Sequence, residues 1–181
     1  MKIAVIGTGY VGLVSGACFS EFGFDVTCID KDLAKIQKIN QGEMPIYEPG
    51  LAELVARNVK AGRLHFGLDL GAAVAAANAV FIAVGTPTRR GDGHADLSFV
   101  YAAAEDIAVH LSGYTVVVTK STVPVGAGRD VAGIIAKTNP DAKFDIASNP
   151  EFLREGAAIS DFMRPDRVVV GAETGAARDI M

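Results

Sequence analysis

Two glutamates four residues apart are the first candidates for chemistry in this sequence. Glu151 and Glu155 lie in "SNPEFLREG", residues 148–156, beside a proline and an arginine. If the segment is helical, the two carboxylates share one face about 5–6 Å apart and repel each other slightly. They could be a solvated helix start, where acids are favoured and Arg154 offsets the repulsion. Alternatively, they are acid–base groups that serve a reaction, and the rest of the chain has to decide between the two interpretations.

A glycine pattern near the N-terminus is the second candidate. "GTGYVG" has the GxGxxG spacing, with Gly7, Gly9 and Gly12, and Asp30 follows at the end of the next expected strand. A strand before the glycines and a helix after them make this a dinucleotide-binding fingerprint. Gly7 permits the tight turn, Gly9 lets the backbone approach a pyrophosphate, and Gly12 lets helix pack on strand. Free N–H groups at the helix N-terminus would then hold the pyrophosphate.

Asp30 also indicates which dinucleotide is bound. Its carboxylate can accept hydrogen bonds from ribose hydroxyls and would repel a 2′-phosphate, so NAD is favoured over NADP. Lys31 and Lys35 are either solvated helix residues or contacts to the adenosine end of the cofactor. Glycines that serve only a tight turn are the less favoured alternative, given the strand–turn–helix context.

Two further strand ends carry hydroxyl groups and a proline. Thr86 lies in "VGTP" (84–87), and Ser121 and Thr122 lie in "KSTVPVG" (120–126). Each alone is ordinary turn chemistry, but two such ends beside a dinucleotide fold favour contacts to cofactor or substrate. No metal site is expected, because the histidines at 65, 94 and 110 share no ligand spacing with cysteines or carboxylates. "DGHAD" (92–96) is better explained as a polar turn.

Composition excludes several classes of protein. The chain has 181 residues, of which 50% are hydrophobic and 21% charged, which suits one domain with a sheet covered on both faces. A net charge of -4 argues against a nucleic-acid partner. Cys18 and Cys28 lie in apolar runs and are expected to be buried thiols in a reducing compartment. No segment resembles a signal peptide or a membrane span, so we expect a cytoplasmic protein.

Short β-branched runs alternate with helical stretches along the whole chain. This rhythm predicts an α/β fold: a doubly wound, Rossmann-type, mostly parallel sheet with helices on both faces. The expected strands are 2–7, 25–30, 79–85, 114–120, 144–149 and 167–171, with a short one possible at 63–67. The expected helices are 11–23, 32–40, 49–61, 69–77, 96–111, 126–137 and 155–161, with Asp32, Asp69 and Asp96 at or near N-caps and Pro49 in a first turn.

Six motifs together resemble the UDP-glucose/GDP-mannose dehydrogenase family. They are "GTGYVGLVSGACFSEFG", "GEMPIYEPGL", "FIAVGTPT", "KSTVPVG", "NPEFLREG" and "RPDRVVVG", in that order along the chain. The resemblance implies oxidation of a nucleotide sugar's C6 alcohol to a carboxylate by two NAD molecules. The reaction would pass through an aldehyde, a cysteine thiohemiacetal and a thioester that water hydrolyses.

The resemblance also implies roles for individual residues. Glu151 would be the general acid–base group that acts on the hydrolytic water, and Thr122 would help to order that water. "EFLRE" would line the sugar-nucleotide site with Glu151, Phe152, Leu153, Arg154 and Glu155. Contacts to NAD are expected from Gly7, Gly9, Tyr10, Val11, Gly12, Asp30, Lys35, Thr86, Thr122 and Glu155.

One departure from the family pattern sets the domain prediction. The family's nucleophilic cysteine, with the lysine and aspartate that assist it, lies in a later domain whose motif is absent here. We therefore expect residues 1–181 to be a truncated NAD-binding Rossmann domain that binds NAD but does not complete the oxidation alone. The long central helix on which family members dimerise is also absent, and the full-length protein is expected to be a homodimer.

Three functions remain open from the sequence. "RPDRVVVG" favours UDP-glucose as the substrate, oxidised to UDP-glucuronate. GDP-mannose or a UDP-N-acetylhexosamine is the alternative substrate within the same enzyme family. The alternative from another class is a non-catalytic dinucleotide-sensing module, against which Glu151 speaks, because a sensor needs no acid–base group beyond the cofactor site.

Overall fold

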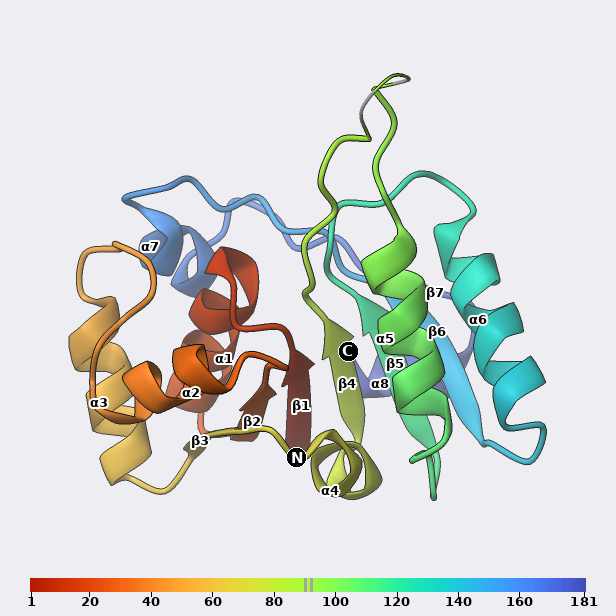
Figure 1. The fold of residues 1–181 in the computed structure, drawn as a ribbon, viewed down its shortest axis with the longest axis horizontal. Coiled ribbons are helices and arrows are strands. Elements are labelled where there is room, and N and C mark those ends of the chain that lie inside the picture. The colour runs from red at the N-terminus through yellow and green to blue at the C-terminus, as the bar shows by residue number, and fades with distance from the viewer. Residues whose placement is uncertain (90, 92) are drawn as a thin grey trace.

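A computed structural model describes residues 1–89, 91 and 93–181 as one sheet covered by helices (Figure 1). Within these residues seven strands are arranged in the order β3-β2-β1-β4-β5-β6-β7. The first six are parallel and the last is antiparallel, which confirms the predicted mostly parallel Rossmann-type sheet. The strands are β1 (Lys2–Ile6), β2 (Asp25–Ile29), β3 (Leu64–Gly67), β4 (Ala79–Ile82), β5 (Thr115–Thr119), β6 (Phe144–Ser148) and β7 (Gly171–Ala172).

The helices lie close to their predicted positions, and two predicted caps are present. Asp32 accepts a hydrogen bond from the Lys35 amide, and Asp69 accepts one from the Ala72 amide. The prediction for Pro49 is wrong, because Gly50 is the N-cap and the first helical residue is Leu51, so Pro49 lies before the helix. The helices are α1 (Tyr10–Glu21), α2 (Leu33–Asn40), α3 (Leu51–Lys60), α4 (Leu70–Ala76), α5 (Ser98–Ala108), α6 (Ala127–Thr138), α7 (Ala158–Met163) and α8 (Gly175–Ile180).

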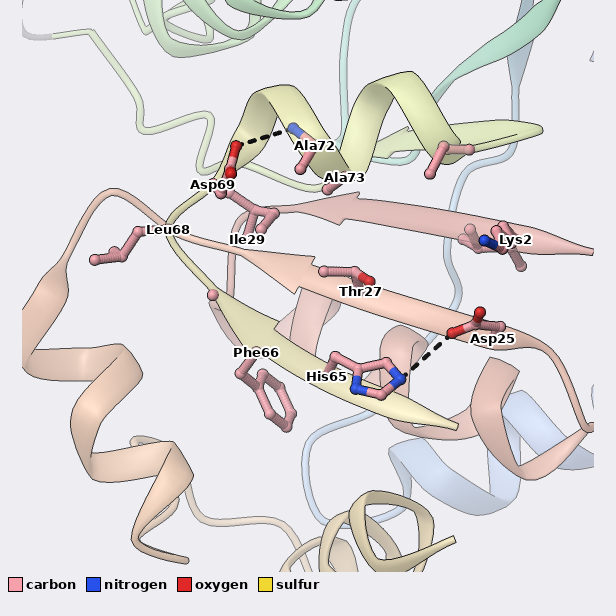
Figure 2. Close-up of a pocket in the computed structure, with 14 residues that line it drawn as sticks. Lys2, Asp25, Thr27, Ile29, His65, Phe66, Leu68, Asp69, Ala72 and Ala73 are labelled. Carbon is pink, nitrogen blue, oxygen red and sulfur yellow. Dashed lines mark hydrogen bonds and ion pairs between the residues drawn. The ribbon is translucent and has the colours of Figure 1, made fainter. Parts of the chain in front are cut away.

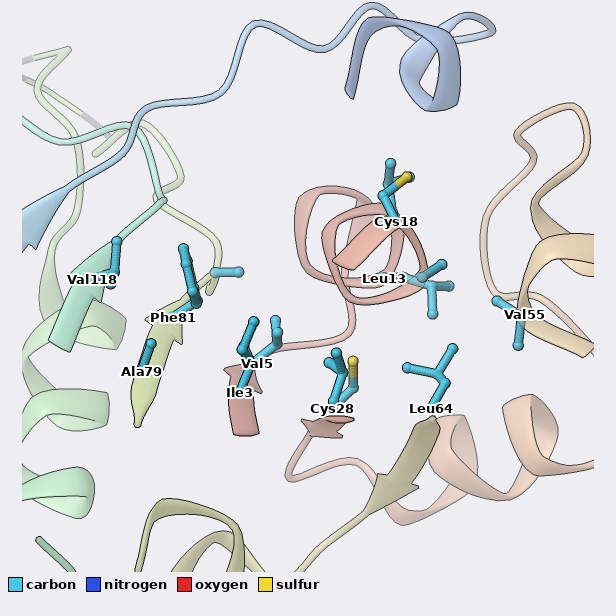
Figure 3. Close-up of a cluster of buried hydrophobic side chains, with 14 of the residues drawn as sticks. Ile3, Val5, Leu13, Cys18, Cys28, Val55, Leu64, Ala79, Phe81 and Val118 are labelled. Carbon is cyan, nitrogen blue, oxygen red and sulfur yellow. The ribbon is translucent and has the colours of Figure 1, made fainter. Parts of the chain in front are cut away.

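Successive side chains of each strand point alternately to the two faces of the sheet, and a hydrophobic core lies on each face. In β1, Ile3 and Val5 pack beneath α1 and α3, whereas Ala4 and Ile6 pack beneath α4, α5 and α6. Figure 3 shows the first core, with Cys18 and Cys28 among its buried side chains. Both thiols are free, as predicted. No helix in the described part of the chain is long and apolar enough to cross a bilayer.

The predicted strand at 167–171 is mostly wrong. Regular pairing begins only at Gly171, and β7 runs antiparallel to β6, while Val168 before it is 67% exposed. The shortness of helix α7 explains why β7 runs antiparallel to β6. Six residues rise only about 9 Å, too little to carry the chain back along a five-residue strand of about 17 Å. The chain therefore returns down the sheet beside β6 instead of crossing over.

The predicted helix at 155–161 begins late. Its first helical residue is Ala158, and Gly156 before it has a positive φ of 85°. The side chain of Glu48, from the distant loop before α3, accepts hydrogen bonds from the amides of Gly156 and Ala158. That contact fixes where α7 starts. Glu151 and Glu155 consequently lie in an irregular segment and do not share a helix face.

Candidate cofactor and acid–base site

The glycine fingerprint lies where the sheet order reverses, between β1 and β4. Gly7 ends β1 with a φ of 103°, and a Cβ there would come within 2.7 Å of the carbonyl oxygen of Ala83, just after β4. A Cβ on Gly12 would come within 2.0 Å of the Gly7 carbonyl oxygen. Both glycines therefore let α1 and the neighbouring strand end approach closely. In open α/β sheets the crevice at this point receives the ligand.

The start of α1 is free to receive an anion. Gly9 is the N-cap, its backbone is extended, and no side chain caps the helix. The first turn of α1 also carries no acidic residue. A Cβ on Gly9 would meet nothing within 4 Å, so the missing side chain leaves open space in front of the turn. Unpaired amides and the positive end of the helix dipole suit a pyrophosphate there.

Asp30 is held rigidly beside this turn. Its Oδ2 accepts hydrogen bonds from the Thr8 amide at 2.9 Å, the Thr8 hydroxyl at 2.7 Å and the Lys35 ammonium at 2.8 Å. Partial burial acts to raise the pKa of Asp30, but these donors outweigh it and lower the pKa to about 2. The carboxylate is therefore ionised at neutral pH, as a ribose acceptor must be. Lys35 reaches this site through Asp30.

A cleft of about 280 Å³ opens beside Asp30. Its walls come from the ends of β1 and β2, from the connection between β3 and α4, and from the C-terminal end of α5. They include Ile6, Leu68 and Val109. The ion pair between Lys31 and Asp106, at 2.7 Å, joins the start of α2 to α5 at this cleft. Apolar walls next to an ionised carboxylate would suit the adenosine end of a dinucleotide.

The hydroxyl groups at the next two strand ends have different surroundings. Ser121 is buried, and its Oγ donates to the carbonyl oxygens of Ile82 and Val84, so it joins the ends of β4 and β5. Thr122 is exposed and Thr86 is half-buried at the same edge. Ser121 is therefore structural, whereas the two threonines remain candidates for contacts to a ligand.

Residues 149–157, here termed the strap, carry both candidate glutamates. Glu151 Oε2 accepts a hydrogen bond from the amide of Leu153 at 2.6 Å. The guanidinium of Arg154 forms two hydrogen bonds with Asp161 on α7, so this side chain is paired with Asp161 and not with the glutamates. Glu155 is exposed. The interpretation as a solvated helix start is wrong, and the strap holds two separate carboxylates at the sheet edge.

Lys120 is a buried cation near Glu151 that the sequence analysis passed over. It is 4% exposed, its Nζ lies 3.0 Å from Asn149 Oδ1, and it lies over the ring of Phe162. Burial lowers the pKa of Lys120 to about 8, although the charge of Glu151 acts in the opposite direction. Lys120, Asn149 and Glu151 line one cavity of about 250 Å³ beneath the strap.

Glu48 is the other residue that sequence reasoning missed. It lies within the motif "GEMPIYEPGL", yet a glutamate in a loop gives no local signal of burial. In the structure it is 6% exposed, and it accepts hydrogen bonds from Tyr10 of the fingerprint and from the strap at Gly156. Tyr10 directly follows the glycine turn at residues 7–9, here termed the cofactor turn, while its hydroxyl is directed to Glu48 and the strap.

A third depression lies next to the cleft beside Asp30 and shares Leu68 with it. Figure 2 shows it on the face of β1, β2 and β3 beside α4, with His65 and Asp25 paired at 3.5 Å. It holds none of the predicted site residues. Among the described residues no cluster of His, Cys, Asp or Glu could hold a metal ion. Asp92 of the "DGHAD" segment lies outside the described residues.

Comparison with known families agrees with this geometry. A family model described as the UDP-glucose/GDP-mannose dehydrogenase family, NAD binding domain, matches residues 1–181. The chain belongs to this family. NAD is accordingly the cofactor of the domain, which agrees with the fingerprint and with Asp30.

Relatives and solved structures extend the match. A UDP-glucose 6-dehydrogenase of Rhizobium meliloti is 64% identical over all of this chain and 42% of its own length. One from Bacillus subtilis is 53% identical over 99% of this chain and 39% of its length. The UDP-glucose dehydrogenase structure from Pyrobaculum islandicum is 43% identical, with a TM-score of 0.95 over 99% of this chain and 42% of that one. The chain thus spans about two fifths of these proteins.

Gly9 and Gly12 should respond in opposite ways to the addition of a methyl group. Gly9→Ala places its Cβ in open space, so the free energy of unfolding should change by less than about 0.5 kcal/mol. The same Cβ occupies the space where the pyrophosphate would lie, so NAD affinity should fall at least tenfold. Gly12→Ala forces a Cβ against the Gly7 carbonyl and should destabilise the fold by more than about 2 kcal/mol. Urea denaturation and calorimetric titration with NAD measure both effects. Unchanged NAD affinity in a folded Gly9→Ala variant would contradict the assignment of the turn.

Because of Lys120, the free energy of unfolding should increase measurably as the pH is raised above neutral. Its pKa is about 8 in the folded chain and about 10.4 when unfolded, so the unfolded chain binds more protons between these values. The free energy of unfolding should therefore rise with pH across this window, by roughly 3 kcal/mol relative to Lys120→Met. Urea denaturation of both proteins from pH 7 to 10.5 tests this. Parallel pH profiles would mean that Lys120 is not a destabilised buried cation.

Proposed function

We propose that this chain is the NAD-binding domain of a nucleotide-sugar dehydrogenase that oxidises UDP-glucose to UDP-glucuronate. The observation that carries the proposal is a complete dinucleotide fingerprint, with ionised Asp30, at the same sheet edge as a strap bearing Glu151. Bound NAD would accept a hydride from C6 of the sugar in each of two oxidation steps. The residues proposed to hold it are Gly7, Gly9, Tyr10, Val11, Gly12, Asp30, Lys35, Thr86, Thr122 and Glu155.

Glu151 and Thr122 would serve the water that ends the reaction. A carboxylate suits general acid–base work when its surroundings keep its pKa useful near neutral pH. Glu151 lines the same cavity as the buried side chain of Lys120, which places it beside enclosed space at the sheet edge. The exposed Thr122 follows Lys120 and Ser121 after the end of β5 and could orient the water by a hydrogen bond. Phe152, Leu153 and Arg154 would line the sugar-nucleotide site on the same strap.

The covalent part of the reaction would need residues beyond this chain. A cysteine thiol would add to the aldehyde, and loss of a second hydride would give a thioester. Water would then release the carboxylate and restore the thiol. Cys18 and Cys28 cannot be this nucleophile, because both are buried and burial raises the pKa of each to about 12. We therefore propose that residues 1–181 form the cofactor domain and that the nucleophile belongs to a later one.

UDP-glucose is favoured over other nucleotide sugars by identity to named relatives. Those called UDP-glucose 6-dehydrogenase reach 64% and 53%, whereas a GDP-mannose dehydrogenase structure from Pseudomonas aeruginosa is 35% identical, with a TM-score of 0.95. A related GDP-mannose or UDP-N-acetylhexosamine dehydrogenase is the second candidate. A non-catalytic NAD sensor is less favoured, because the strap carries Glu151 in addition to the cofactor-binding residues.

The setting of the intact protein is also part of the proposal. Free, buried cysteines fit a reducing compartment, so we propose the cytoplasm. We propose a homodimer formed through segments beyond this chain. The acidic net charge of -4 gives no basis for nucleic-acid binding.

Asp30→Ala tests the cofactor assignment. Calorimetric titration should show that the wild-type chain binds NAD more tightly than NADP, because the Asp30 carboxylate repels a 2′-phosphate. The variant should lose at least tenfold in NAD affinity and most of its preference over NADP. Asp25→Ala, at the exposed opposite end of β2, is the matched control and should bind NAD as the wild type does. Equal affinity of the wild type for both cofactors would contradict the role of Asp30.

Glu151→Gln tests the acid–base assignment in the protein that contains this domain together with its later segments. Loss of the group that activates water should slow turnover about 10²- to 10⁴-fold, and a covalent sugar–enzyme adduct should accumulate with UDP-glucose and NAD. Intact-protein mass spectrometry measures the adduct. Glu155→Gln is the control, which should raise the KM for NAD and accumulate no adduct. Full turnover in Glu151→Gln would remove Glu151 from the mechanism.

A further inference from the structure

Glu48 is a buried carboxylate held entirely by groups from distant parts of the chain. Its Oε2 accepts hydrogen bonds from the Tyr10 hydroxyl at 2.6 Å and the Gly156 amide at 2.8 Å. Its Oε1 accepts one from the Ala158 amide at 2.9 Å. These partners are 38, 108 and 110 residues away in sequence. Burying a carboxylate is costly unless donors replace the lost water, so this arrangement has to form as a unit.

The protonation states suit a permanent link. Burial acts to raise the pKa of Glu48, but the donors, led by Tyr10, outweigh it and lower that pKa below its usual value. Burial and the neighbouring Glu48 raise the pKa of the Tyr10 hydroxyl, so the phenol keeps its proton. At neutral pH Glu48 is thus an acceptor and Tyr10 a donor, and their bond is charge-assisted.

The two ends of this link are the two halves of the proposed site. Tyr10 is the first residue of α1 and directly follows Gly9, where the pyrophosphate would approach. Gly156 lies in the strap directly after Glu155, and the same strap carries Glu151. The Tyr10 hydroxyl also lies 3.3 Å from the carbonyl oxygen of Arg154 in the strap. One side chain from the loop before α3 therefore connects the cofactor turn with the acid–base strap.

We propose that Glu48 is a positioning residue, which acts through Tyr10 and the strap amides to fix the acid–base strap relative to the cofactor turn. The inference rests on the proposed function, because it gives that site a residue that touches neither cofactor nor substrate. A strap fixed in advance loses little conformational freedom when NAD binds. Loosening it should therefore weaken NAD binding from outside the contact surface.

Glu48→Gln and Tyr10→Phe in this 181-residue chain test the proposal. The first change puts an amide N–H where an acceptor is needed, and Tyr10→Phe removes only the hydroxyl. We expect NAD affinity to fall roughly tenfold in Glu48→Gln and about threefold in Tyr10→Phe, in line with the loss of one or two hydrogen bonds. Because both act through one link, the double variant should bind NAD no more weakly than Glu48→Gln. Glu53→Gln, an exposed acid in α3, is the charge-matched control.

Hydrogen exchange at the amides of Gly156 and Ala158 separates positioning from simple stabilisation. Exchange should be faster in Glu48→Gln and should slow towards the wild-type rate when NAD is saturating, because binding then has to order the strap. Faster exchange with NAD affinity within twofold of the wild type would reduce Glu48 to a structural role and overturn the inference. If Glu48→Gln does not fold, unchanged affinity in Tyr10→Phe overturns it.

The wild-type titration separates this inference from the proposed function. A folded wild-type chain that binds no NAD would overturn the proposed function and this inference with it. Wild-type binding that Glu48→Gln matches would overturn this inference alone.

Discussion

The close approach of α1 to the ends of β1 and β4 is the constraint on which the site depends. A Cβ on Gly12 would lie 2.0 Å from the Gly7 carbonyl oxygen, and one on Gly7 would lie 2.7 Å from that of Ala83. Only glycine permits this packing, and it directs the free N-terminus of α1 at the crevice where the sheet order reverses. The strand register then brings Asp30, at the end of β2, beside the same turn.

The second half of the site depends on buried polar contacts more than on the sheet. After β6 the chain forms no regular structure until α7, so its conformation has to come from side chains. Glu48 holds the end of the strap through backbone amides, and Lys120 holds its start through Asn149. A carboxylate and an ammonium, each at most 6% exposed, thus anchor the two ends. Such groups stabilise a structure only when their partners are all in place, which favours one conformation of the strap.

The local signals of the sequence were sufficient for the fold and for the cofactor turn. The glycine spacing, Asp30 at a strand end, and the aspartate caps of α2 and α4 all depend on neighbours within a few residues, and the structure confirms them. The direction of β7 is not predictable from the valines at 168–170 that precede it, because it follows from the shortness of α7. The irregular conformation of the strap is not predictable for a similar reason, since Glu48, which binds the Gly156 amide, is 108 positions away.

An NMR titration of the uniformly ¹⁵N-labelled chain with NAD would show whether the start of α1 holds the pyrophosphate. We expect the largest shifts on the amides of Val11 and Gly12, with smaller ones near Asp30 and at the strap. Shifts confined to the depression around Thr27 and His65 on β2 and β3, with the first turn of α1 unaffected, would contradict this expectation (Figure 2).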